Sequence, residues 1–188
     1  MSRERLDPKN YIVNTFPKAS GYVQPYVENP LDTKHFPGEG IYRQILGTAK
    51  DYVYIVSPYL ILDNTMTTAL TSAAKAGIDV RILTPKIRDK WYVHPVTQFN
   101  SQEMLEAGVR IFEFTPGFVH SKLFVSDDAV ATCGTINMDY RSFYFHFECG
   151  VWMCKTKAVE DIKEHFLKLQ EVSEEIILSK WSKRPLRK

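Results

Sequence analysis

The stretch from Tyr52 to Thr84 constrains the fold of this 188-residue chain more than any other. DYVYIVS alternates as a strand, and residues 63–76 have the pattern of a helix that Asp63 or Asn64 caps and Gly77 ends. IDVRILT follows as a second strand. A helical crossover between two strands is typical of parallel pairing, so this order predicts a sheet covered by helices.

Further elements are expected on both sides of this unit. Periodicity predicts helices over 40–50, 98–107 and 157–174, and strands over 109–114, 119–126, 129–133 and 143–154. The predicted class is therefore α/β, with a mixed, mostly parallel sheet flanked by helices on both faces. Recurrent prolines predict that residues 1–36 form an extended segment outside the core. Residues 37–188 form the folded unit, with a closing helix and a basic tail.

Composition excludes several classes of protein. A hydrophobic content of 44% and a charged content of 24% are those of an ordinary globular domain. The net charge of +2 and the pI near 8.3 are too mild for a nucleic-acid-binding protein. No apolar run reaches the roughly eighteen residues that a membrane span requires, so the isolated chain is expected to be soluble. Cys133, Cys149 and Cys154 fit no metal pattern and are predicted to be buried free thiols in a reducing compartment.

Chemistry-bearing residues concentrate between Thr115 and Met153. His120 and Lys122 lie two apart, so on one strand they share a face. An imidazole that titrates near neutral pH beside a compact ammonium suits a phosphate group. Asp127 falls on the opposite face and is expected to be a salt-bridged scaffold residue.

The residues that follow complete a site. Gly134 allows close backbone approach, Asn137 offers an amide donor, and Glu148 is expected to hold the second ring nitrogen of His120 and to set its tautomer. Thr135 stands between Gly134 and Asn137. No metal and no cofactor is expected.

HSKLFVSDDAVATCGTIN resembles the HKD signature of the phospholipase D superfamily, H-x-K-x4-D-x6-G-[S/T]-x-N, with Thr135 where many members carry Ser. The words TPGFVHSK, GTINMDYRSFYFHFECGVW, SPYLILD and DKWYVHPVTQFN are similar to the C-terminal half of bacterial cardiolipin synthases. The resemblance runs from about Gly21 to about Trp181, and GYVQPYVENPLD resembles the bridge between the halves.

This resemblance implies a transferase that joins two phosphatidylglycerol molecules into cardiolipin and glycerol through a phosphohistidine. Two HKD motifs form the site, so the other half comes from the parent chain or from a homodimer mate. His120 would be the acid/base, Lys122 and Asn137 would bind phosphate, and Glu148 would orient His120. The parent would lie at the cell membrane, with this domain on the reducing cytoplasmic side in peripheral membrane contact. A dimeric single-motif phosphodiesterase or nuclease and an inactive lipid-binding half remain alternatives.

Five further residues are weaker candidates for substrate binding. Tyr59 and Asp63 lie where a strand ends and a helix begins, which fits either a pocket lining or a helix cap. His94 lies in an aromatic loop and fits either a lipid border or a structural role. Arg141 and Ser142 would bind a second phosphate or a glycerol group, and an ion pair of Arg141 with Asp139 or Asp127 is equally compatible.

Overall fold

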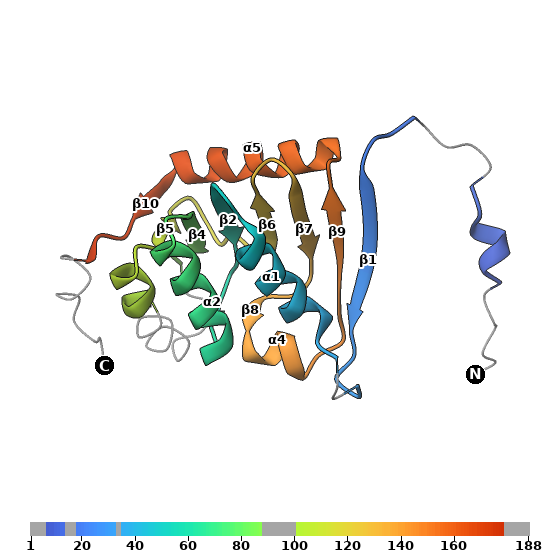
Figure 1. Cartoon of the computed structure of the whole chain (residues 1–188), viewed down its shortest axis with the longest axis horizontal. Coiled ribbons are helices and arrows are strands. Elements are labelled where there is room, and N and C mark those ends of the chain that lie inside the picture. The colour runs from blue at the N-terminus through green and yellow to red at the C-terminus, as the bar shows by residue number, and fades with distance from the viewer. Residues whose placement is uncertain (1–6, 14–17, 33–34, 88–100, 179–188) are drawn as a thin grey trace.

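The computed structural model describes residues 7–13, 18–32, 35–87 and 101–178 (Figure 1). Residues 101–106 are helical, and none of the helices in the described part of the chain is long and apolar enough to cross a membrane. The remaining elements are η1 (Pro8–Tyr11), β1 (Tyr22–Glu28), α1 (Pro37–Thr48), β2 (Tyr52–Val56), β3 (Leu60–Ile61), α2 (Asn64–Lys75), β4 (Asp79–Pro85), β5 (Arg110–Phe114), β6 (Leu123–Ser126), β7 (Val130–Gly134), β8 (Met138–Asp139), α4 (Tyr140–Tyr144), β9 (Glu148–Cys154), α5 (Lys157–Glu171) and β10 (Ser173–Glu175).

The main sheet has the strand order β1-β9-β7-β6-β2-β4-β5-β10. The crossover through α2 makes β2 and β4 parallel, and β4 pairs in parallel with β5. The other pairings in this sheet are antiparallel: β6 and β7 form a hairpin, the segment that contains β8 and α4 returns the chain to β7 as β9, and β1, β6 and β10 pair with β9, β2 and β5. The mixed α/β sheet is therefore confirmed, but the expected predominance of parallel pairing is wrong.

Helices cover both faces of the sheet, as predicted. Val53 and Ile55 of β2 face a core shared with α1 and α2, which Figure 1 shows in front of the strands. Tyr54 and Val56 point the other way, into a second core that α5 closes with Val159. The period-two alternation of β2 thus divides one strand between two cores.

Two predicted strand boundaries are wrong. β6 begins only at Leu123, so His120 and Lys122 lie in an irregular segment just before it. The strand expected over 143–154 begins at Glu148, because α4 and the turn that follows it occupy residues 140–147. Asp139 caps α4 by accepting a hydrogen bond from the Ser142 backbone, and tertiary packing overrides the strand propensity of this aromatic run.

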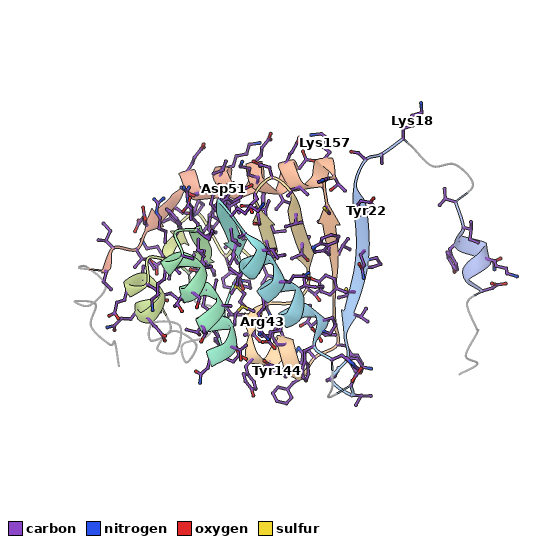
Figure 2. The ribbon with its side chains drawn as sticks, in the orientation of Figure 1. Lys18, Tyr22, Arg43, Asp51, Tyr144 and Lys157 are labelled. Carbon is purple, nitrogen blue, oxygen red and sulfur yellow. The ribbon has the colours of Figure 1, made fainter. Side chains whose placement is uncertain are left out.

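The proline-rich N-terminal segment contributes to the sheet. β1 pairs along its length with β9 and forms an edge strand, on which Figure 2 labels Tyr22. Tyr26 is buried in the core, and its hydroxyl lies 2.7 Å from the Thr132 hydroxyl. The expectation that this segment lies outside the core is therefore wrong for β1.

The three cysteines are free, but they are not buried as predicted. Cys133 and Cys149 are exposed, and Cys154 is half-buried. An apolar run indicates that a strand forms, whereas it does not indicate which part of that strand a helix covers.

Tyr144 ties α4 to the first turns of two other helices. Its hydroxyl lies 2.7 Å from Glu39 on α1 and 2.7 Å from Asp63, the cap of α2. Burial, together with these two carboxylates, raises the pKa of Tyr144, so the phenol remains a hydrogen-bond donor. Figure 2 labels this side chain at the end of the molecule where α4 lies.

We expect Tyr144→Phe to lower the free energy of unfolding by about 1–2 kcal/mol, since two carboxylates would then face each other without their shared donor. Tyr140→Phe is the matched control, because Tyr140 is a half-exposed neighbour on the same helix. Urea unfolding of both variants measures the difference. Equal stabilities of the two variants would show that the Tyr144 hydroxyl is dispensable.

Candidate active site

His120 and Lys122 form a compact pair at the entrance to β6. The Lys122 ammonium donates to the His120 carbonyl at 2.7 Å and lies 3.0 Å from Nδ1 and 3.1 Å from Nε2 of the same ring. Lys122 is buried, whereas His120 is exposed. The two side chains therefore come together as the sequence predicts, and the imidazole remains accessible to a ligand.

The charge of Lys122 depends on its surroundings. Burial lowers the pKa of Lys122, and the negative charges of Glu148 and Asp139 only partly offset this effect. A phosphate anion beside the ammonium would add a further opposite charge, which favours the protonated lysine. Binding of a phosphate would therefore counteract the effect of burial on the pKa of Lys122.

Asp127 lies at the opposite end of β6, in the turn to β7. Its carboxylate accepts hydrogen bonds from the backbone amides of Lys50, Asp51 and Tyr52 at 2.8, 3.1 and 2.9 Å. Burial acts to raise the pKa of Asp127, but these amides outweigh it and the net pKa is lowered. Among the described residues the partners of Asp127 are backbone amides rather than the basic side chain that was expected.

Gly134 and Thr135 bring β7 against β9. A Cβ at Gly134 would collide with the Cys149 carbonyl, which explains the glycine. Thr135 donates its backbone amide to the same carbonyl at 2.8 Å and its hydroxyl to Glu148. Glu148 is thereby fixed beside the motif. Its hydrogen bonds in the described part of the chain do not include one to His120, so its orienting role stays a prediction.

The side chain of Asn137 is positioned by a hydrogen bond to the short helix α4. Its amide Nδ2 donates to the Ser142 hydroxyl at 3.0 Å, and the Ser142 backbone donates to Asp139 at 2.7 Å. The amide oxygen of Asn137 is buried and has no hydrogen-bond partner among the residues that the structure describes. Ser142, predicted as a substrate-binding residue, thus lies at the site as the support of Asn137.

Arg141 makes a contact that the sequence did not suggest. Its Nε donates to Nε2 of His146 at 2.7 Å, rather than to Asp139 or Asp127. Nδ1 of His146 lies 3.7 Å from Glu148. The alternation of His146 with Glu148 was the sequence signal for this residue, and it was too weak to include His146 among the candidates.

The hydrogen bonds of the other predicted binding residues do not include the motif residues in the described part of the chain. Asp63 accepts from the Met66 backbone at 2.8 Å, so the helix-cap alternative describes its contact. Tyr59 is half-buried, and its carbonyl accepts from the Ser57 hydroxyl at 2.9 Å. His94 lies outside the described residues.

Glu28 is a second residue that sequence reasoning missed. It faces Glu148 across the β1–β9 pairing, is only 2% exposed, and accepts from the Gly38 backbone. Burial raises the pKa of Glu28 to about 7, even though the Gly38 amide acts in the other direction. An acidic residue in a half-apolar strand was the available signal, and it carried too little information to place Glu28 beside the site.

The arrangement offers an exposed imidazole, a fixed ammonium and an amide, on the segments that enter β6 and leave β7. These are groups for binding a phosphate and for moving a proton or forming a bond at phosphorus. Within the described ranges no three His, Cys, Asp or Glu side chains are placed to hold a metal. A groove of about 630 Å³ between α1 and α2 is lined by none of the motif residues.

Known proteins resemble the chain in sequence. The family model described as "Cardiolipin synthase, PLD-like domain" matches residues 42–170. An uncharacterized protein of Streptococcus mutans is 46% identical over 178 residues, which cover 94% of this chain and 38% of that protein. The cardiolipin synthase of Geobacillus kaustophilus is 35% identical over 189 residues, covering 100% of this chain and 38% of the synthase. The chain thus spans well under half the length of these relatives.

Solved structures share the fold at low identity. The phospholipase D family member Nuc from Salmonella typhimurium superposes with a TM-score of 0.70 at 16% identity and covers 84% of this chain and 99% of its own. NucT from Helicobacter pylori gives a TM-score of 0.66 at 15% identity, covering 84% of this chain and 100% of its own. At such identities the likeness establishes the fold alone.

Proposed function

Because this chain belongs to the family of cardiolipin synthase phospholipase D-like domains, we propose that it supplies one of two half-sites of a phosphatidyltransferase. The reaction would join two phosphatidylglycerol molecules into cardiolipin and release glycerol. The observation that carries this proposal is the accessible His120 imidazole against the buried Lys122 ammonium. Asn137 follows Gly134, whose backbone amide donates to the Lys122 carbonyl at 3.3 Å.

The reaction proceeds in two displacements. A histidine of one half-site attacks the phosphorus of the first phosphatidylglycerol, and glycerol leaves with a proton from the histidine of the other half-site. The second histidine then removes the proton from a hydroxyl of the second phosphatidylglycerol, whose oxygen bonds to phosphorus as the phosphohistidine bond breaks. We assign His120 the acid/base role. Lys122 and Asn137 stabilise the charge on the phosphoryl oxygens.

The second half-site comes from another part of a longer chain or from a second copy. The proposal is supported by the length of the curated relatives, since this chain corresponds to 38% of the Geobacillus kaustophilus synthase. Phosphatidylglycerol is a membrane lipid, so we also propose that the working protein contacts the membrane surface, at the cell membrane.

The test is an assay with vesicles of phosphatidylglycerol. It compares this chain alone with a protein that contains both half-sites. We expect cardiolipin and glycerol in equal amounts from the species that contains both half-sites. A parallel assay with double-stranded DNA distinguishes the nuclease alternative. DNA cleavage without cardiolipin would contradict the proposal, and vesicle binding without either product would favour an inactive lipid-binding half.

A further inference from the structure

Arg141 differs from the other described arginines because its hydrogen-bond partner is a histidine ring rather than a carboxylate. It is exposed, and it donates its Nε to an uncharged acceptor, the His146 ring, while its two Nη groups have no partner among the described residues. The other arginines in the described ranges each meet a carboxylate, in the pairs Arg43–Glu39, Arg81–Asp79 and Arg110–Glu175.

The contact with Arg141 determines which ring nitrogen of His146 carries the proton. A ring nitrogen that accepts a hydrogen bond carries no proton, so the proton of neutral His146 is on Nδ1, which faces Glu148 at 3.7 Å. The Glu148 carboxylate is itself engaged by the Thr135 hydroxyl. Arg141 is thus held in place without being neutralised, and its Nη fork remains open to an anion.

Two connections place this guanidinium beside the motif. The next residue on α4, Ser142, receives the amide hydrogen bond of Asn137. On the other side, the partner of His146 is Glu148, whose charge acts on Lys122. Arg141 is therefore linked to Asn137 through its neighbour Ser142 and to Lys122 through His146 and Glu148, and it is not one of the groups that contact the His120 ring.

We propose that Arg141, positioned by His146, binds the phosphate of the acceptor in the transfer reaction. This inference rests on the proposed function. Two phosphates meet when one phosphatidylglycerol reacts with another: the reacting phosphate at His120 and Lys122, and the unreacting phosphate of the acceptor. A planar guanidinium fork matches two oxygens of such a phosphate. When the acceptor oxygen displaces the histidine from phosphorus, its own phosphate stays on Arg141. Water and glycerol lack that group, so Arg141 would favour transfer to an anionic acceptor over hydrolysis.

Binding is tested on the chain itself, without turnover. Glycerol 3-phosphate, inorganic phosphate and glycerol are titrated separately while the Arg141 Nε–H signal is followed by nuclear magnetic resonance. We expect both phosphates to shift this signal and glycerol to leave it in place. Vesicles of phosphatidylglycerol then show whether a lipid headgroup shifts the signal as free phosphate does. Vesicles of phosphatidylcholine, whose headgroup has no net charge, are the control.

The variants separate binding from structural support. Arg141→Gln should weaken glycerol 3-phosphate binding about tenfold, as for loss of a charge-assisted hydrogen bond, whereas Arg43→Gln on α1 should leave it unchanged. His146→Leu should weaken binding, and His146→Gln, whose amide oxygen still accepts from Nε, should restore it. In the active protein, Arg141→Gln should lower the ratio of cardiolipin to phosphatidic acid about tenfold, since hydrolysis needs no acceptor phosphate.

Two results would overturn this inference: Arg141→Gln binding glycerol 3-phosphate as tightly as the unaltered chain, or the Arg141 signal not moving at millimolar ligand. Either would reduce the Arg141–His146 contact to a structural contact between α4 and the turn that follows it. Failure of the proposed function looks different, because it would appear as absence of cardiolipin while phosphate still shifts Arg141.

Discussion

Replacement of His120 by asparagine is expected to lower cardiolipin formation by about 10³-fold, because it would remove the proposed general acid/base, a group that typically contributes 10²–10⁴-fold. Asparagine keeps a polar side chain of similar length, and His120 is exposed in an irregular segment ahead of β6. The fold should therefore be preserved. The measurement is the initial rate with phosphatidylglycerol vesicles in the protein that contains both half-sites.

The matched control is His35→Asn, which alters an exposed histidine that pairs with Asp32 and lies on another segment. Its rate should equal that of the unaltered protein. A rate for His120→Asn within threefold of the control would contradict the assignment of His120. Circular dichroism of both variants verifies that loss of activity is not loss of fold.

The second large effect concerns stability. Asp127→Ala should lower the free energy of unfolding by about 2–4 kcal/mol, because three backbone amides at the start of β2 lose their charged acceptor. Asp127 also adopts a left-handed backbone with φ of 54°, which alanine tolerates poorly. Asp127→Asn keeps one acceptor oxygen and tolerates this backbone, so it should cost about half as much. Thermal or urea unfolding measures the stability of both variants. An ordinary surface substitution changes the free energy of unfolding by no more than about 0.5 kcal/mol. If Asp127→Ala stays within that range, these hydrogen bonds do not hold β2 in place.

The contribution of Asp127 also has a defined pH dependence. Its pKa is lower in the folded chain than in the unfolded chain, so its stabilisation is complete above the ordinary aspartate pKa of about 3.9. It is lost as the pH falls through the folded pKa. The stability difference between the unaltered chain and Asp127→Asn should therefore be constant near neutral pH and narrow below about pH 4. A stability difference that stays constant down to pH 2 would show that folding does not lower the pKa of Asp127.

Much of the fold follows from local pattern. The crossover from β2 through α2 to β4, the Asp63 cap and the position of α5 were all predictable, because each depends on residues near in sequence. The α4 helix was not predictable, since its aromatic residues favour a strand by propensity. Buried contacts and the Asp139 cap decide its conformation instead.

The sequence by itself determined which chemical groups the site contains: a histidine and a lysine two residues apart, then an asparagine and a glutamate on later segments. Only the tertiary structure decided which of these groups touch. Glu148 meets Thr135, Arg141 meets His146, and Asp127 meets amides that lie 75 to 77 residues away. The physical reason is strand register. The pairing of β7 with β9 brings Thr135 to Glu148, and the pairing of β6 with β2 brings Asp127 to the amides at the start of β2, whereas Arg141 reaches His146 in the turn that follows α4. A shift of one residue in either pairing would turn the facing side chains to the other face of the sheet.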